Sequence, residues 1–474
     1  MTPLWTSNEV LNAIKGTPSS ENFWEANGVS IDSRTIMPGN IFIAIDGEKF
    51  DGHSYIDEAF QKGAIAAVVS KKIKNFANKN YIFVKNTLLS LEDLAKYSRS
   101  RTKAKIIAIT GSVGKTTTKE ILYTALKNQF LVYASQGNLN NQIGVPLSLA
   151  RIPAQTDFAI LELGMNNSGE IRELTKIAKP NYALITAIEA AHLEFFSSID
   201  GIAEAKAEIF EGVENKGIAI LNRDNNFFNK LSKKAKEHNL KVISFGANKK
   251  ADVKLLSYVL HDECSCVKSD IKGQNMVLKI GSPGLHVINN CLSVLAVVQA
   301  IGGDLSLASI SFSELKLPTG RGNRKTFTIE DGEIELIDES YNASPASMKA
   351  ALQLLGQSNL KNNGRRIAVL GDMLELGVKS LSFHEGLSKF IEKACVDMVF
   401  CSGQYMKSLY KVLPEGIYKE WKSEAYELTS SIKSKLRAGD VVMVKGSFGS
   451  KMGVIVRDLD ESYKKKMNID RYIN

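Results

Sequence analysis

AKIIAITGSVGKTTTKEILYTALKNQF, residues 104–130, is the stretch that decides the fold class of this 474-residue chain. It opens with an apolar run of strand length, turns in a glycine-containing loop, and continues with the periodicity of a helix. The loop Gly111–Thr117 can curl so that successive backbone N–H groups face one point at the positive end of the helix. A strand, loop and helix of this kind predict an α/β domain that holds a nucleoside triphosphate.

The loop departs from the full pattern GxxxxGK[ST], because Ile109 stands where the first glycine belongs and Gly111 supplies the turn instead. In such a loop Lys115 would reach the β- and γ-phosphates, and Thr116 would offer its hydroxyl to Mg²⁺. Glu162 ends the apolar run FAILEL, where a metal-binding carboxylate is expected in an open α/β sheet. The loop could instead be a plain turn between a strand and a helix, and Glu162 could be a carboxylate that faces water. The occurrence of the loop together with Glu162 favours nucleotide binding over both alternatives.

Strands and helices alternate along the rest of the chain and predict three α/β units. Residues 1–84 form a small mixed α/β domain, and residues 85–318 form a central domain with a mostly parallel sheet. Residues 319–474 form a doubly wound, Rossmann-like domain that lacks GxGxxG, so no dinucleotide site is expected there. Strands are predicted at 158–163, 182–186, 218–222, 242–246, 334–338, 366–371, 397–403 and 441–446, and an antiparallel patch at 250–288.

Composition is ordinary for a globular protein, with 44% hydrophobic and 23% charged residues and a net charge of +9. There is no apolar run of about 18 residues and no secretion-signal pattern, so no membrane partner is expected. Five scattered cysteines without metal-site spacing are typical of reduced thiols, which indicates a cytoplasmic location. No basic stripe with interleaved aromatic residues occurs, so nucleic acid is not expected as a partner either.

Motifs along nearly the whole chain resemble the Mur ligase family of peptidoglycan synthesis. In chain order they are Asp32-Ser33-Arg34, the Gly111–Thr117 loop, GNLNNQIGVP at 137–146, Glu162-Leu163-Gly164, AHLE at 191–194, AKAEIF at 205–210, Gly320-Arg321, residues 338–345, GDMLELG at 371–377 and Lys445-Gly446-Ser447. The motifs at 137–146 and 371–377 are similar to the subfamily that adds D-alanyl-D-alanine. The resemblance implies an ATP-dependent amide-bond ligase, in which the terminal carboxylate of UDP-N-acetylmuramoyl-tripeptide becomes an acyl phosphate that the amine of D-alanyl-D-alanine attacks.

The resemblance also implies roles in ATP binding and catalysis. ATP would be bound by Gly111, Ser112, Val113, Gly114, Lys115, Thr116 and Thr117, with Asn290 at the adenine, Asp338 at the ribose and Arg321 on the γ-phosphate side. Thr116 and Glu162 would hold one Mg²⁺, and His192 would hold a second. Lys206 would carry a carbamate, an anion that can approach a metal site where an ammonium would be repelled. The catalytic residues would be Lys115, Lys206, His192 and Arg321.

Substrate contacts follow from the same resemblance. Ser33 and Arg34 would lie near the uridine of the UDP-linked substrate, in a substrate-binding domain at 1–84. Asn138, Asn140 and Asn141 would lie near its muramoyl group. Tyr341, Asn342, Lys445 and Ser447 would bind the dipeptide in a ligase domain at 319–474, and the protein would be a monomer.

Three single residues and one tripeptide depart from the family pattern. Phe448 stands where arginine is usual, Ser344 and Val287 where asparagine is usual, and Ala187-Ile188-Glu189 where Asn-Ile-Gly is usual. A guanidinium can pair with the carboxylate of the dipeptide in a bidentate geometry, which phenylalanine cannot do. We therefore expect another cation to take this role, and Lys451 is the candidate.

Three other interpretations stay open. The first is another amino-acid-adding Mur ligase or a folylpolyglutamate synthase, against which the motif at 371–377 argues. The second is a P-loop kinase or NTPase, which would not depend on a muramoyl peptide. The third is a non-catalytic binding protein with an eroded site, against which the presence of Lys115, Glu162, His192 and Lys206 argues.

Overall fold

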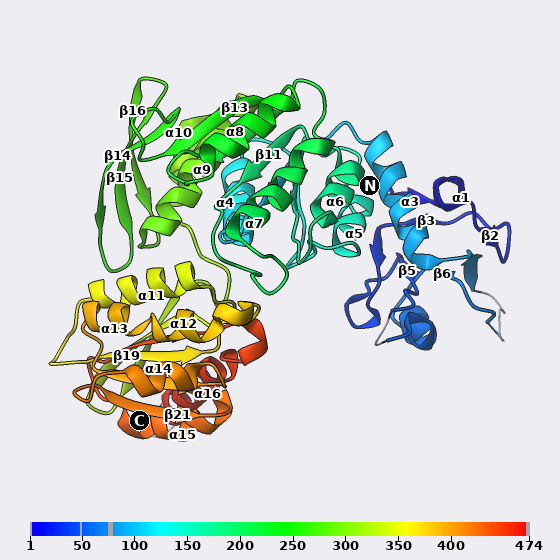
Figure 1. Ribbon diagram of the computed structural model, residues 1–474. Helices are drawn as coiled ribbons and strands as arrows, with labels where there is room; N and C mark the ends of the chain where they lie inside the picture. The colour runs from blue at the N-terminus through cyan, green and yellow to red at the C-terminus, as the bar shows by residue number, and fades with distance from the viewer. Residues whose placement is uncertain (1, 48–49, 74–78, 471–474) are drawn as a thin grey trace.

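The computed structural model describes residues 2–47, 50–73 and 79–470. Its larger sheets lie in three lobes (Figure 1), with the N-terminal lobe to one side of the central lobe and the C-terminal lobe below it. Each of these sheets falls within one of the ranges 1–84, 85–318 and 319–474, and these limits themselves stay a prediction. None of the helices in the described ranges is long and apolar enough to cross a membrane.

The N-terminal lobe carries a five-stranded sheet in the order β2-β7-β6-β5-β4. Its strands are β2 (Thr17–Pro18), β4 (Gly28–Ser30), β5 (Asn40–Ile43), β6 (Ala66–Val69) and β7 (Asn80–Phe83), beside the short pair β1 (Trp5–Thr6) and β3 (Glu25–Ala26). Its helices are α1 (Ser7–Ile14) and α2 (Ile56–Gln61), with 3-10 turns at Ser33–Thr35 and Gly52–Tyr55. The strands β4, β5, β6 and β7 pair in parallel, and β2 is antiparallel to β7. The lobe is therefore a mixed α/β unit, as predicted.

The central sheet has nine strands in the order β16-β15-β14-β13-β12-β11-β8-β10-β9. They are β8 (Lys105–Thr110), β9 (Val132–Ala134), β10 (Phe158–Glu162), β11 (Tyr182–Ile185), β12 (Ile218–Asn222), β13 (Lys241–Gly246), β14 (Val253–Leu260), β15 (Ser265–Ile271) and β16 (Gln274–Ile280). Strands β8 to β13 pair in parallel, which confirms the predicted runs. The predicted antiparallel patch is the extension β14 to β16 of the same sheet, and it ends before α9.

The position of β8 places the glycine loop. Residues 106–110 are fully buried, and the strand lies between β10 and β11. A doubly wound sheet has its crevice where neighbouring strands lead off in opposite directions, at the carboxyl ends of the strands. The Gly111–Thr117 loop leaves β8 into this crevice, and α4 (Lys115–Leu126) begins there.

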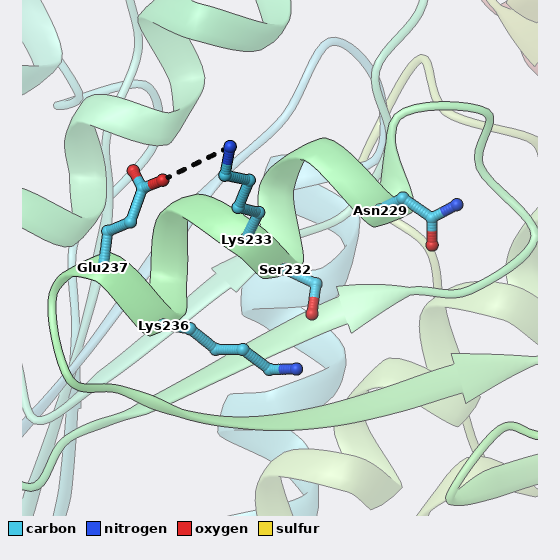
Figure 2. A pocket seen from close by; sticks show the side chains of 5 residues that line it. All are labelled: Asn229, Ser232, Lys233, Lys236 and Glu237. Atoms are coloured by element: carbon cyan, nitrogen blue, oxygen red, sulfur yellow. Dashed lines mark ion pairs between the residues drawn. The ribbon is translucent and has the colours of Figure 1, made fainter.

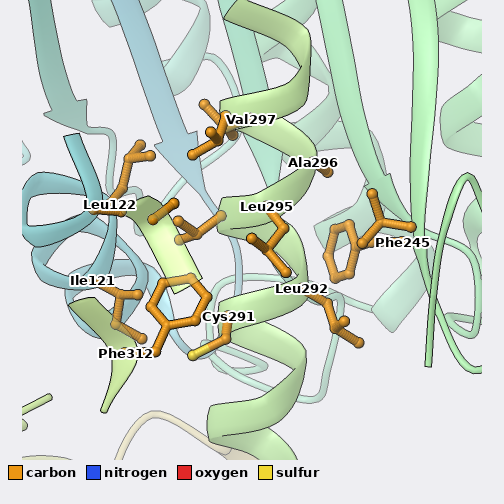
Figure 3. Close-up of a cluster of buried hydrophobic side chains, with 14 of the residues drawn as sticks. Ile121, Leu122, Phe245, Cys291, Leu292, Leu295, Ala296, Val297 and Phe312 are labelled. Atoms are coloured by element: carbon orange, nitrogen blue, oxygen red, sulfur yellow. The ribbon is translucent and has the colours of Figure 1, made fainter. Parts of the chain in front are cut away.

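Helices cover both faces of the central sheet. Besides α4 they are α5 (Gly144–Ala150), α6 (Glu170–Ala178), α7 (Ile199–Ala207), α8 (Phe228–Glu237), α9 (Leu285–Ile301) and α10 (Leu305–Phe312), with a 3-10 turn at Glu208–Gly212. Helix α3 (Thr87–Arg101) packs on α5 and α6 and against α1 of the N-terminal lobe. Helix α9 is apolar on nearly every side, which is typical of a buried helix. Figure 3 shows its side chains between Ile121 and Leu122 of α4 and Phe245 of β13. This packing fixes α9 beside the glycine loop.

The C-terminal lobe has a six-stranded sheet in the order β17-β18-β22-β19-β20-β21. The strands are β17 (Asn323–Ile329), β18 (Gly332–Glu339), β19 (Arg366–Gly371), β20 (Met398–Ser402), β21 (Tyr418–Lys422) and β22 (Val441–Lys445). The helices are α11 (Pro345–Gln357), α12 (Ser380–Glu385), α13 (Ser388–Lys393), α14 (Met406–Val412), α15 (Thr429–Lys435) and α16 (Gly453–Asp470), with 3-10 turns at Gly377–Lys379, Ala425–Leu428 and Phe448–Ser450. The four predicted strands are β18, β19, β20 and β22, whereas the two edge strands were not predicted because their sequences are too polar.

Candidate active site

Two glycines give the phosphate loop its shape. Gly111 has φ +151°, and a Cβ there would stand 1.9 Å from Thr186 Oγ1. Gly114 has φ +84°, and a Cβ there would stand 2.8 Å from Asn290 Oδ1. Thr186 Oγ1 in turn donates a hydrogen bond to the Val113 carbonyl at 2.6 Å. Only glycine fits at either position, and the loop lies directly against β11 on one side and α9 on the other.

Glu162 is the centre of a hydrogen-bonded group at the crevice. Thr116 Oγ1 donates to Glu162 Oε2 at 2.8 Å, and Asn140 Nδ2 donates to Glu162 Oε1 at 2.8 Å. Arg321 Nη2 donates to Thr116 Oγ1 at 3.1 Å. The structure therefore brings together the phosphate loop, the end of β10, the 137–146 segment and the first residues of the C-terminal lobe.

Two lysines lie beside this group, and within the described ranges neither forms an ion pair with a carboxylate. Lys115 Nζ donates to the Gly111 carbonyl at 2.8 Å, and burial lowers the pKa of Lys115 against the opposing charge of Glu162. Lys206 is 1% exposed, and no residue in the described part of the chain accepts a hydrogen bond from its Nζ or forms an ion pair with it. Burial, and next the charge of Lys115, lower the pKa of Lys206 well below its ordinary value. This environment therefore favours the neutral amine form of the Lys206 side chain.

His192 lies on the loop that follows β11, at the contact between the central and C-terminal lobes. Its Nδ1 is 2.6 Å from Oε2 of Glu375, which belongs to the 371–377 motif. The hydrogen bond from His192 lowers the pKa of Glu375. His192 is not hydrogen-bonded to Thr116 or Glu162. Of the three predicted metal ligands, Thr116 and Glu162 therefore contact each other, and His192 lies apart from them.

The remaining nucleotide-binding predictions fall around the loop. Ser112 N donates to the Ala187 carbonyl at 2.8 Å, and Thr117 is buried at the start of α4. Asn290 stands against Gly114 of the phosphate loop, and its contact with the adenine stays a prediction. Asp338 is 1% exposed and accepts hydrogen bonds from the backbone of Gly320 and from Ser340. In this arrangement Asp338 braces the turn that carries Arg321.

The predicted dipeptide residues form a second group in the C-terminal lobe. Lys445 is 2% exposed and donates to Glu339 Oε2 at 3.0 Å and to the Asn342 carbonyl at 2.9 Å. Ser447 Oγ accepts a hydrogen bond from Leu374 N at 2.9 Å. Lys445 and Ser447 therefore hold the loops of this lobe together.

An aromatic contact links that group to the phosphate loop. The guanidinium of Arg321 lies 4.4 Å from the ring centre of Tyr341, and the ring of Phe448 lies 5.7 Å from that of Tyr341. Phe448 is 73% exposed. Lys451 follows the 3-10 turn at Phe448–Ser450, is exposed, and has φ 55°. Among the residues that the structure describes, no carboxylate forms an ion pair with Lys451, which lies at the edge of this group.

The predicted UDP-substrate residues are not gathered in one place. Ser33 Oγ donates to Glu58 Oε2 at 2.8 Å, and the exposed Arg34 pairs with Asp32, both within the N-terminal lobe. Asn138 is exposed, and Asn141 Oδ1 accepts hydrogen bonds from the backbone at the start of α5. Of the three asparagines, only Asn140 contacts the group at Glu162.

The donor set at the crevice fits a magnesium ion. Thr116 and Glu162 present a hydroxyl and carboxylate oxygens, the ligands that Mg²⁺ prefers. Within the described ranges no three His, Cys, Asp or Glu residues cluster in a way that could hold a metal by themselves. A magnesium ion here would therefore take its other ligands from phosphate oxygens and water, as is usual for this ion at nucleotide sites.

A separate pocket lies on α8, away from these residues. Figure 2 shows the side chains that line it, all from one helix: Asn229, Ser232, Lys233, Lys236 and Glu237. Lys233 and Glu237 pair with each other at 4.0 Å. None of the predicted site residues lines this pocket, so it does not belong to the candidate active site.

Three family models match successive parts of the chain. The Mur ligase family catalytic domain matches residues 25–99, the Mur ligase middle domain residues 109–298, and the Mur ligase glutamate ligase domain residues 323–448. A protein of Rickettsia prowazekii named UDP-N-acetylmuramoyl-tripeptide–D-alanyl-D-alanine ligase is 39% identical over 454 residues, which cover 96% of this chain and 99% of the relative. This chain belongs to the Mur ligase family.

Other relatives of this Mur ligase agree in name and in fold. A Bacillus subtilis protein with the same name is 33% identical, and the match covers 96% of this chain and 98% of that protein. A crystal structure of MurF from Acinetobacter baumannii has a TM-score of 0.84 at 29% identity, covering 96% of this chain and 99% of that one. A structure of MurF ligase from Thermotoga maritima in complex with ADP has a TM-score of 0.76 at 26% identity. The match covers 93% of this chain and 98% of that chain. The three-domain α/β fold predicted from the sequence is confirmed.

Two residues of this Mur ligase had no predicted role, although each contacts a residue or loop for which a role was predicted. Glu375 pairs with His192, and Lys119 donates to the carbonyls of Ser135 and Gly137 at 2.6 and 3.0 Å. Lys119 follows Lys115 by one helical turn, and this spacing is a signal that could have placed both on one face of α4. For Glu375 the only signal was a carboxylate in a glycine-flanked loop after a strand.

Proposed function

We propose that this Mur ligase joins D-alanyl-D-alanine to the terminal carboxylate of UDP-N-acetylmuramoyl-tripeptide and converts ATP to ADP and phosphate. The observation that carries the proposal is full-length similarity to ligases of that name, 39% identical in one relative, across all three lobes. The convergence of Lys115, Glu162 and Arg321 at one crevice supports it. A folylpolyglutamate synthase matches far less closely, with a TM-score of 0.56 at 13% identity.

ATP would enter the crevice at the end of β8. Backbone N–H groups of the Gly111–Thr117 loop would face its phosphates, and Lys115 would exchange its hydrogen bond to the Gly111 carbonyl for a phosphate oxygen. Thr116 and Glu162 would hold Mg²⁺, which supplies charge neutralisation on the phosphates. Arg321 reaches the same hydroxyl from the C-terminal lobe, so the γ-phosphate side of the site is completed only when that lobe is in place.

The chemistry then has two displacements. The terminal carboxylate of the tripeptide attacks the γ-phosphorus, the bond to ADP breaks, and an acyl phosphate forms. The amine of D-alanyl-D-alanine attacks the acyl carbon, loses a proton, and phosphate leaves. Negative charge grows at both stages, and Lys115 and Arg321 are the cations placed to stabilise it.

Lys206 would act as a carbamate. Its neutral amine adds CO₂ and loses a proton, which gives an anion at a position where an ammonium would be buried without a partner. A carbamate can help to hold a cation beside the phosphates. The lowered pKa of Lys206 supports this assignment, because only the neutral amine reacts with CO₂.

Phosphate release is the test. The purified protein would be assayed with ATP, Mg²⁺ and UDP-N-acetylmuramoyl-tripeptide, with and without D-alanyl-D-alanine. Rapid release only with both substrates is expected, with a product whose mass equals the tripeptide plus the dipeptide less water. Turnover without the muramoyl peptide, or faster turnover with a single amino acid such as glutamate, would contradict the proposal.

A further inference from the structure

His192 and Glu375 meet across the boundary between the central and C-terminal lobes. Nδ1 of His192 lies 2.6 Å from Oε2 of Glu375, although the two residues are 183 positions apart in the chain. Their φ angles are 57° and 63°, in the left-handed region that residues other than glycine rarely adopt. Such backbone strain persists only where the surrounding structure enforces it, and it points to a function at the contact.

The backbone of both loops supports the same contact. Glu194 N donates to the Glu375 carbonyl at 3.0 Å. A Cβ on Gly377, which has φ +58°, would stand 3.2 Å from the Glu194 Cα, so the two loops approach as closely as a glycine allows. The side-chain pair is therefore part of a built interface and not a chance meeting of two exposed groups.

The hydrogen bond assigns different tasks to the two ring nitrogens of His192. An ionised carboxylate can only accept a hydrogen bond, so Nδ1 of His192 carries the hydrogen and donates it to Glu375. In the neutral ring Nε2 then has a free lone pair, and neutral imidazole is the form in which histidine binds a metal. Metal-binding histidines commonly donate their other N–H to a carboxylate that fixes the ring.

The same loop is attached to the phosphate site at its other end. Ser112 N donates to the Ala187 carbonyl at 2.8 Å, and Ser112 Oγ donates to the Glu189 carbonyl at 3.0 Å. His192 stands three residues beyond Glu189. The 187–194 segment is thus held by the phosphate loop at one end and by the C-terminal lobe at the other.

We propose that Glu375 is a positioning residue that orients His192 and holds its Nδ1–H form, so that Nε2 binds a divalent cation while the C-terminal lobe is docked. The inference rests on the proposed function, since the cation is the second one of the ligation reaction. It makes loading of this cation dependent on the contact between the lobes, whereas a cation at Thr116 and Glu162 does not depend on Glu375.

The first test is ¹⁵N NMR of histidine-labelled protein without nucleotide or metal. The chain has six histidines, and His192→Gln identifies the signals of His192. The wild type is expected to have Nδ1 protonated and Nε2 unprotonated. Glu375→Gln should retain this form because its amide oxygen still accepts a hydrogen bond, and Glu375→Ala should lose it. Glu385→Ala, which removes an exposed carboxylate on α12, is the matched control and should change nothing.

The second test counts bound Mn²⁺ by electron paramagnetic resonance with saturating ADP and bicarbonate. The wild type is expected to bind two Mn²⁺, and Glu375→Ala should weaken one of them by about 10- to 100-fold and leave the other unchanged. The proposal is overturned if Glu375→Ala binds both ions as the wild type does, if the wild type binds one, or if His192 keeps its Nδ1–H form without Glu375. Neither measurement involves ligation, so failure of the phosphate-release assay would contradict the proposed substrates and leave these results standing.

Discussion

Lys206 is a lysine whose surroundings do not suit an ammonium. It is 1% exposed, and burial lowers its pKa well below the ordinary value. We expect Lys206→Ala to be inactive, because the carbamate is lost, and short carboxylates such as acetate to restore part of the activity. In the wild type, ¹³C-bicarbonate should give a carbamate signal that the variant lacks.

Lys216→Ala is the matched control for Lys206, since Lys216 is an exposed lysine of the same lobe. It should keep the carbamate signal and full activity. Undiminished activity of Lys206→Ala in buffer depleted of CO₂ would show that the reaction does not need the modification.

Lys115 is the ammonium of the phosphate loop. Lys115→Ala should lower kcat by on the order of 10²-fold or more, because the lost charge lies where the phosphoryl group is transferred. Circular dichroism and thermal unfolding should stay close to those of the wild type. Lys105→Ala, at the exposed start of the same strand, should have normal kcat. A kcat of Lys115→Ala within threefold of the wild type would remove Lys115 from the catalytic residues.

Helix α4 carries a second lysine that fastens a neighbouring loop. Lys119 is fully buried, and Nζ contacts the carbonyls of Ser135 and Gly137 and the carboxylate of Glu120. Lys119→Met should cost about 1–3 kcal/mol of unfolding free energy, because it leaves the buried Ser135 carbonyl unpaired. It should also raise the KM for the UDP-linked substrate more than that for ATP, because the loop leads to Asn140.

The control for that element is Lys127→Met, at the exposed end of α4. Its stability and both KM values should match those of the wild type. Equal rises of both KM values in Lys119→Met would mean that the lysine supports α4 as a whole rather than the substrate loop.

The turn after β22 is an element where this chain departs from the pattern of its family. Phe448 is 73% exposed, and Lys451 follows it as an exposed cation. Lys451→Ala should raise the KM for D-alanyl-D-alanine and leave the KM for ATP unchanged, because Lys451 would pair with the carboxylate of the dipeptide. Lys393→Ala, elsewhere on the C-terminal lobe, serves as control. An unchanged dipeptide KM in Lys451→Ala would place that carboxylate elsewhere.

The whole molecule contributes through the docking of its lobes. Arg321 belongs to the C-terminal lobe and donates to Thr116 of the central lobe at 3.1 Å. Arg321→Ala should lower kcat by about 10²-fold, while the Kd for ADP, measured by calorimetry, changes by less than about threefold because the phosphate loop itself is intact. Arg457→Ala, which changes an exposed residue of α16, should leave both kcat and the Kd for ADP unchanged. A large loss of ADP affinity in Arg321→Ala would mean that the arginine serves binding rather than turnover.

Local features of the chain could be predicted from the sequence because they depend on neighbouring residues. The strand, the glycine loop and α4 follow from periodicity and from glycines that allow φ values other residues avoid, and the structure places them as expected. The edge strands β17 and β21 were missed because an edge strand need not be apolar, and YKEWK at 418–422 resembles a loop. Fold class and family were therefore readable from the sequence.

The arrangement of the candidate site was decided by tertiary structure. Asn140, whose contact with the muramoyl group stays a prediction, is hydrogen-bonded to Glu162. Arg321 meets Thr116 across 205 residues, and His192 meets Glu375 across 183. No local pattern specifies such contacts, because they form only when separately folded lobes pack against each other. The sequence by itself determined which residues are available for the chemistry, and the docking of the lobes decided which of them meet.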